Sequence, residues 1–308
     1  MSAQSVKFSS DSNGESILRP TPCQQSRRLV ISMVGVEKEI KINVVVEDFR
    51  VGFFATFLFM IVVGYILTKC FVDEDHQAIM VDIFGSTSIC TYFDFPPSTY
   101  VIPLLYVFPM ICEILYDLMS IFRVWIAKEE CKISHCAMVT LICSHIYVIL
   151  SMIWLTAVFA VPPDRAHPET AIVHTLPYAN LKIALCVLQI SVVWFGTKVA
   201  WVGLELPRWF IPASWLHAIL QTIVMLVSNV MIINSLGDLG KENLEGRGLW
   251  WNVQEPGAKS LMNALANIGS FILAFIIPFI ANLYLSFMGF KTHSLIFSIG
   301  DNREAKTE

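Results

Sequence analysis

The 308 residues include 55% hydrophobic side chains and only 15% charged ones, with a formal net charge of −4. A soluble domain carries about 25% charged residues, so this composition indicates a protein whose solvent is largely lipid. The acidic balance offers no basic surface for a nucleic acid, which we exclude as a partner.

Residues 1–50 are predicted to form a cytosolic arm. The first 28 residues are polar and rich in Ser, so they lack the apolar side chains that a folded core needs. The stretch 38–48 contains several β-branched residues and is typical of a short strand. We expect most of the arm to be flexible. No apolar run lies in the first thirty residues, so we expect no cleaved secretory signal peptide.

Six apolar segments follow, and each has about the 20 residues that an α-helix needs to cross about 30 Å of hydrocarbon. The segments are 51–72, 100–124, 136–161, 177–201, 209–235 and 261–288. We therefore predict an all-α fold, a polytopic membrane protein with a six-helix transmembrane bundle over 51–288. The C-terminal tail, 289–308, is predicted to be cytosolic.

The positions of Lys and Arg predict how the bundle lies in the membrane, because short loops rich in these residues stay in the cytosol. Positive charge gathers in the arm, in the loop after the second segment and in the tail. The first loop on the opposite side is acidic and has no Lys or Arg, although the third has mixed charge. We therefore predict that both ends of the chain are cytosolic (N-in/C-in).

Polar side chains within the predicted spans are the candidate functional residues, because such groups are costly in lipid. They are Glu113, Asp117, His145, Lys182, His217 and Gln221. Glu113 and Asp117 lie four residues apart on one helical face. Counted from the cytosolic ends at 1.5 Å per residue, Glu113, His145 and His217 lie at a similar depth, about 12–16 Å.

If their helix faces converge, this acid and histidine layer would be a proton relay, an ion-coupling site or a metal site. The alternative is that these side chains pair with one another and tie the helices together by hydrogen bonds.

The predicted outer side has candidates of its own. His167 and His174 lie near the membrane face, where they would sense pH or contact lipid headgroups, or would simply be solvated. Cys70 and Cys90 are the cysteines predicted on this side, and an oxidising compartment would allow a disulfide between them.

Signatures of soluble enzyme chemistry are missing from the sequence. It contains no HExxH, GxSxG or GxxxxGK[ST] motif and no CxxC pair. We therefore expect no cofactor and assign no catalytic, cofactor-binding or metal-binding residue. His145, His217 and Asp117 match only part of the histidine and aspartate set of membrane lipid hydrolases, so an enzyme is the less favoured interpretation.

The run from Trp154 to Phe159, the polar turn with His167, and His174 at the outer start of the fourth segment resemble the corresponding stretch of the DRAM-type and Frag-type six-helix membrane proteins. The resemblance implies a six-helix regulator of lipid handling, GPI-anchor maturation or lysosomal and plasma-membrane homeostasis, without a cofactor. The chain departs from that family at Leu176 and Pro177, where small residues are common.

The sequence thus predicts a non-enzymatic, multi-pass membrane protein that regulates membrane or lipid processes. Membrane lipids are its expected partners, with protein partners for the cytosolic arm. A transporter or channel subunit that uses the acid and histidine layer is the first alternative, and a membrane-embedded lipid hydrolase is the second. The plasma membrane and the endomembranes (lysosome, Golgi, ER) both stay open as locations.

Overall fold

The computed structural model describes residues 28–30, 40–73, 75–130, 132–164, 166–167, 169–195, 208–237, 258–287 and 295–299. Within this part of the chain, six helices are long and apolar enough to cross a membrane, which confirms the predicted number of spans. Most of the predicted 1–50 arm and 289–308 tail lies outside the described residues.

Four spans are single helices: α1 (Val46–Phe71), α3 (Ser98–Glu129), α6 (Thr170–Phe195) and α7 (Phe210–Gly237). The other two are interrupted. One consists of α4 (His135–Leu155) and the short α5 (Ala157–Ala160). The last consists of α8 (Ala258–Phe271), a π-helical turn η4 (Ile272–Ile276) and α9 (Ile277–Phe287). Pro278 follows this turn, and a proline within a helix lacks the N–H that would continue the regular hydrogen-bond ladder.

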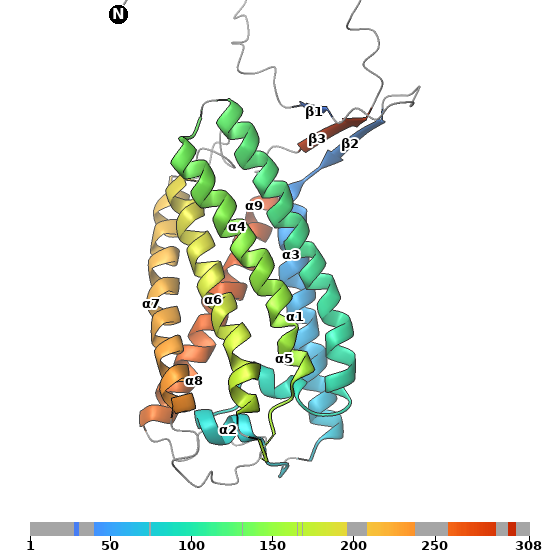
Figure 1. The fold of residues 1–308 in the computed structure, drawn as a ribbon, viewed down its shortest axis with the longest axis vertical. Coiled ribbons are helices and arrows are strands. Elements are labelled where there is room, and N and C mark those ends of the chain that lie inside the picture. Colours follow the sequence, from blue (N-terminus) through green and yellow to red (C-terminus); the bar gives the residue numbers. More distant parts are fainter. Residues whose placement is uncertain are drawn as a thin grey trace, which may run out of the picture.

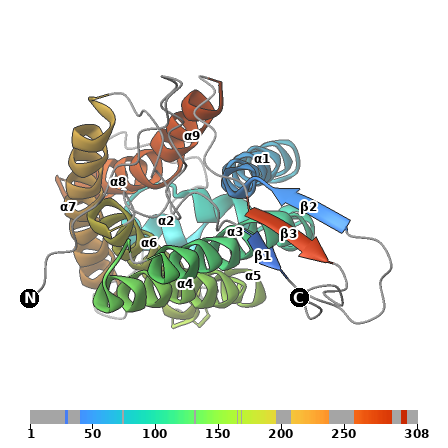
Figure 2. The ribbon, with the colours of Figure 1, turned by 90° about the horizontal axis from the view of Figure 1, so that it is seen from above.

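The spans form a closed ring, seen from above in Figure 2. Each span packs on the next along the chain, and α9 packs on α1 to close the ring. Aromatic rings hold that closure: Phe275 stacks on Phe57 with centroids 4.6 Å apart and meets the Phe54 ring edge-on at 6.5 Å. Because the number of spans is even, α1 begins and α9 ends at the same end of the bundle (Figure 1).

A small sheet lies beside that end (Figure 1). It contains β1 (Arg28–Val30), β2 (Ile40–Val44) and β3 (Leu295–Ile299) in the order β1-β3-β2. β3 runs parallel to β1 and antiparallel to β2, with Ile42 opposite Phe297. β2 lies inside the predicted strand region 38–48, but the strand in the tail was not predicted. The all-α prediction therefore holds for the membrane-spanning bundle and omits this sheet.

The first loop on the opposite side, which the sequence analysis described only by its acidic charge, is folded. It contains α2 (Ile79–Phe84), which ends at Gly85 with φ 66°, and the 3-10 helix η2 (Ile89–Phe93). Ile79, Met80, Ile83 and Phe84 are buried against residues of α6 and α7.

Side-chain hydrogen bonds hold this folded loop against the bundle. Thr68 at the end of α1 donates to the carbonyl of Tyr92 at 2.9 Å, and the Asn263 amide donates to the carbonyl of Phe84 at 3.0 Å. The loop thus covers the end of the bundle opposite the sheet (Figure 1).

Large apolar side chains point outward along the spans. Phe59, Leu104 and Trp194 are 59%, 71% and 64% exposed. Such a surface is unfavourable in water and is the surface expected of helices that face lipid. The chain is therefore an integral, multi-pass membrane protein.

Candidate functional site: two ion pairs and a bipartite pocket in the bundle

Two acid-containing pairs connect α1, α3 and α4 near the end of the bundle that carries the sheet. The Glu113 carboxylate, fully buried on α3, forms an ion pair with the Arg50 guanidinium of α1. The same guanidinium lies over the rings of Tyr116 and Phe54, 4.8 and 4.9 Å from their centroids. One turn along α3, Asp117 Oδ1 lies 2.7 Å from Nδ1 of His145 on α4. The structure therefore brings together three of the predicted residues, Glu113, Asp117 and His145.

Arg50 is the partner that the sequence analysis missed. We placed the start of the first helix at residue 51 and counted Arg50 with the arm, whereas α1 begins at Val46. The helix extends toward the sheet because Glu47 and Asp48 occupy its first turn, where acidic side chains favour the positive end of the helix dipole. Arg123 of α3 also binds Glu47 through two hydrogen bonds, of 2.5 and 2.9 Å. A buried carboxylate such as Glu113 needs a cation at a similar depth, and this need could have identified Arg50 from the sequence.

His217 and Gln221 of α7 lie outside this cluster, so the condition that all the helix faces of the layer converge is met only for Glu113, Asp117 and His145. His217 Nε2 donates to the carbonyl of Leu273, 2.7 Å away in the π-helical turn. A π turn shifts the backbone pairing, so this imidazole satisfies a carbonyl of the last span. Gln221 is buried, and its Oε1 has no hydrogen-bond partner among the described residues.

The metal-site alternative has no geometric support in the described part of the chain, where no group of three or more His, Cys, Asp or Glu side chains could hold a metal ion. Similarity in depth alone did not make the predicted side chains converge. α7 packs on α6 and α8 and does not face α3, so its histidine points to a different neighbour.

Lys182 lies in the half of the bundle away from the sheet. Its ammonium donates to Ser228 Oγ of α7 at 2.6 Å and lies 5.0 Å from the centroid of the Tyr178 ring. No carboxylate of the described residues forms an ion pair with it. A hydroxyl and an aromatic face thus replace the counter-ion that a buried ammonium usually has.

The two predicted outer histidines differ in their surroundings. His167 is two-thirds exposed, 3.4 Å from the equally exposed Glu169. His174 is buried on α6, with Nδ1 3.2 Å from the carbonyl of Val161 and Nε2 3.4 Å from Asp94 Oδ1. Burial raises the pKa of the Asp94 carboxyl well above its ordinary value of 3.8, because water no longer stabilises its charge.

The predicted disulfide does not form in this structure, since Cys70 and Cys90 are both free. Cys70 is exposed near the end of α1, whereas Cys90 belongs to η2, which is folded into the bundle. Burial raises the pKa of the Cys90 thiol to about 12. The spacing of the two cysteines could not reveal this, because the loop between them is folded.

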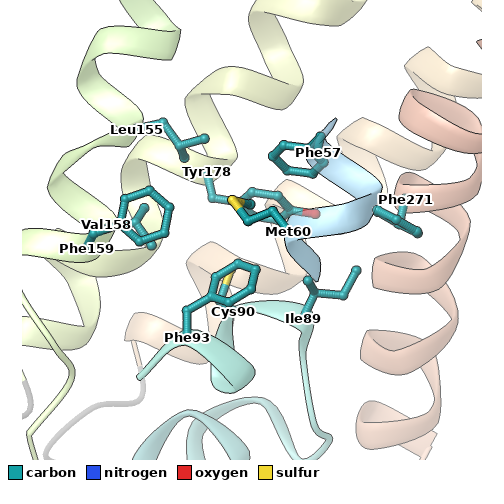
Figure 3. Close-up of a pocket in the computed structure, with 10 residues that line it drawn as sticks. All are labelled: Phe57, Met60, Ile89, Cys90, Phe93, Leu155, Val158, Phe159, Tyr178 and Phe271. Carbon is teal, nitrogen blue, oxygen red and sulfur yellow. The ribbon is translucent and has the colours of Figure 1, made fainter. Parts of the chain in front are cut away.

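Cys90 lines two pockets that adjoin within the bundle. The first, the apolar pocket, is drawn in Figure 3 and is a small cavity of about 20 Å³. Its lining residues come from α1, η2, α4, α5, α6 and α8: Phe57, Met60, Ile89, Cys90, Phe93, Leu155, Val158, Phe159, Tyr178 and Phe271.

The second pocket, which we call the polar-edged pocket, is a larger cavity of about 130 Å³ that is partly open to the outside. It lies between α2, η2, α6, α7 and α8 and is lined by Met80, Phe84, Thr87, Ser88, Ile89, Cys90, His174, Thr175, Tyr178, Ile232, Ala264, Asn267, Ile268 and Phe271. Ile89, Cys90, Tyr178 and Phe271 line both pockets, so the two are neighbours across shared walls.

Comparison of the chain with protein-family models, with curated proteins and with solved structures found no match.

Proposed function

We propose that this chain is a non-enzymatic membrane protein that binds a membrane lipid inside its six-helix bundle and thereby takes part in lipid handling. The observation that supports the proposal is the pair of adjoining pockets, one wholly apolar and one with polar groups at its edge. A mostly apolar lining with a few polar groups is typical of ligand sites. An amphipathic molecule could place its apolar part against the apolar lining and its polar group at the polar edge.

The proposed orientation has both ends of the chain in the cytosol, in agreement with the excess of Lys and Arg at that end. The pockets then lie in the outer half of the bundle, and the sheet lies on the cytosolic side with the arm that would meet protein partners. The resemblance to DRAM-type and Frag-type proteins agrees with a role in lipid handling at the plasma membrane or an endomembrane.

A second candidate function is ion-coupled transport. It is favoured by Glu113 Oε2 and Asp117 Oδ2, two buried carboxylate oxygens without a hydrogen-bond partner among the described residues. The other oxygen of each acid is paired, however, and this arrangement suits a connection between helices. Proton flux into vesicles that contain the purified protein, compared with Asp117→Asn, tests the candidate: equal flux from both proteins and from empty vesicles would exclude it.

Photolabelling tests the lipid proposal. The full-length protein in nanodiscs is irradiated with a mixture of lipids that carry a diazirine and an alkyne in the acyl chain, and labelled peptides are mapped. We expect label on peptides of η2, α6 and α8. Ala264→Trp places a large ring in the polar-edged pocket and should reduce labelling at least about fivefold.

The matched control is Leu265→Trp, the next residue of α8, which is 61% exposed and lines neither pocket. It should leave labelling of the pocket peptides unchanged. Equal labelling of wild type and Ala264→Trp, with both proteins folded by size-exclusion chromatography, would contradict lipid binding in these pockets.

A further inference from the structure

The polar-edged pocket opens sideways, within the thickness of the membrane. Among the described residues that line it, Ile268 of α8 alone is exposed, at 57%. Leu265 and Ile272, on the same face of the helix, are exposed as well, so this face is directed to lipid. The last span begins at Leu261, and Ile268 lies seven residues further, about 10 Å into the hydrocarbon at 1.5 Å per residue. The opening at Ile268 therefore leads to lipid and not to water.

The ring of spans is closed differently along its length. Toward the sheet, α9 packs on α1, and Phe275 of the π-helical turn stacks on Phe57. Toward the other end, η2 packs on α1 and lines the pocket with Ile89 and Cys90. The last span lines the pocket there through α8. The opening at Ile268 therefore lies along the seam between η2 and α8.

The cavity is large enough for part of one acyl chain. About 10–15 Å³ of such a cavity accommodates one water molecule, so a cavity of about 130 Å³ accommodates on the order of ten groups of that size. A methylene group is about as large as a water molecule. The α8 wall, from Ala264 to Phe271, is about 10 Å long at 1.5 Å per residue. The terminal part of a single chain fits this space, whereas both chains of one lipid, or the fused rings of a sterol, exceed it.

The lining indicates which part of a lipid enters. No Lys, Arg, Asp or Glu is among the described residues that line the pocket. Burial of a phosphate or carboxylate without a cation is costly. Much of the wall consists of buried apolar side chains, among them Met80, Phe84 and Ile232. The charged head group of a membrane lipid is therefore expected to stay at the membrane surface while the chain enters.

We propose that the polar-edged pocket takes up the terminal part of one acyl chain of a membrane lipid, which enters from the bilayer past Ile268, between η2 and α8, while the head group stays outside. The inference rests on the proposed lipid binding and adds the part of the lipid that is bound and the route by which it enters. Phospholipids and single-chain amphiphiles, such as lysophospholipids and fatty acids, share this chemistry. Sterols do not.

Two photoactivatable phosphatidylcholines test the inference in nanodiscs that contain the full-length protein. One carries the diazirine near the methyl end of an acyl chain, and the other carries it next to the ester. Label is quantified on the peptide that contains α2, where Met80, Ile83 and Phe84 are buried away from the surrounding lipid. We expect the chain-end probe to label this peptide at least about fivefold more than the ester probe, because an ester buried without a hydrogen bond is disfavoured.

A variant at the opening tests the route. Ile268→Trp narrows the opening and should reduce label from the chain-end probe at least about threefold, because the chain must then displace a large ring. Leu265→Trp is the matched control, since Leu265 is exposed on the same face of α8 and lines neither pocket. It should leave the label on the α2 peptide unchanged. Both positions are exposed, so both variants should fold, which size-exclusion chromatography checks.

The source of the chain is tested by the lipid composition of the nanodisc. In separate arms, the same fraction of the phosphatidylcholine is replaced by phosphatidylserine, lysophosphatidylcholine, oleate or cholesterol. Phosphatidylserine should change the label on the α2 peptide less than about twofold, because the head group stays outside. A decrease with lysophosphatidylcholine or oleate would identify a single-chain amphiphile as the source of the chain, and an unchanged label would identify the phospholipid; both results agree with the inference.

Three results would overturn the inference: equal labelling of the α2 peptide by the two probes, equal labelling of wild type and Ile268→Trp, or a larger decrease with cholesterol or phosphatidylserine than with the single-chain lipids. Label from the mixed probes on peptides of η2, α6 and α8 would persist in these cases, so lipid binding in the pocket would stand. Loss of all pocket labelling would instead contradict the proposed function.

Discussion

The ion pair between Arg50 and Glu113 gives the most direct test of how the bundle is held together. Arg50→Met removes the cation and leaves a carboxylate that is 0% exposed, in contact with no other cation of the described residues. Breaking a buried pair in this way costs about 3–5 kcal/mol. We expect about 3 kcal/mol, since the carboxyl can take up a proton and so escape part of the cost. Up to about 1 kcal/mol of this comes from the lost cation–π contact with Tyr116.

The double variant Arg50→Met with Glu113→Leu separates the pair from its parts. Because it leaves no buried charge, its stability should lie within about 1 kcal/mol of wild type. The assay is reversible unfolding in mixed detergent micelles, followed by circular dichroism. Glu47→Gln, which breaks the partly exposed pair with Arg123, is the comparison and should cost at most about 1 kcal/mol. The reasoning would be refuted if Arg50→Met and Glu47→Gln lowered the free energy of unfolding equally. It would also be refuted if the loss in the double variant equalled the sum of the losses in the two single variants.

Three further predictions concern the half of the bundle away from the sheet. Lys182→Met should leave the melting temperature in detergent unchanged or higher, because among the described residues the buried ammonium has only Ser228 and an aromatic ring as partners. A clear decrease would show that the charge is required. The free energy of unfolding should fall as pH rises above 3.8, because Asp94 retains a proton in the folded protein that the unfolded chain releases. Asp94→Asn should reduce this slope in melting curves recorded from pH 4 to 7. Parallel slopes for wild type and Asp94→Asn would contradict the prediction. Maleimide should label Cys90 at pH 7.5 more than about tenfold more slowly than the exposed Cys70, because little Cys90 thiolate exists with a pKa of about 12; mass spectrometry that found equal rates, or a disulfide, would contradict the folded loop.

Particular residues show why the candidate site was predicted only in part. Helical spacing placed Glu113 and Asp117 on one face of α3, and this face does meet His145. Depth along the chain suggested His217 as well, yet depth says nothing about which way a helix is turned. The partner of Glu113 was hidden by a boundary error of five residues, 46 instead of 51, because a charged residue at the edge of an apolar run reads as loop.

Local sequence also misled for the loop of α2 and η2. Its acidic residues and missing Lys or Arg fit an outer loop, but Phe84 and Phe93 are buried, and the loop is held by Thr68 and Asn263 from the first and last spans. Contacts between positions as distant as Phe84 and Asn263 leave no periodic signal in either segment. The pockets that the proposals depend on have this loop as one wall, so they could not be predicted either.

By itself, the sequence determined the number of membrane spans and the side chains that are expensive to bury. The reason is that backbone in lipid must satisfy its own hydrogen bonds, which makes each long apolar run a helix whatever surrounds it. Only the tertiary structure decided which polar groups meet, that Cys70 and Cys90 are free, and that a hollow remains beside His174 and Thr175. Those outcomes depend on how each helix is rotated and what folds over its end, and packing between distant segments sets both.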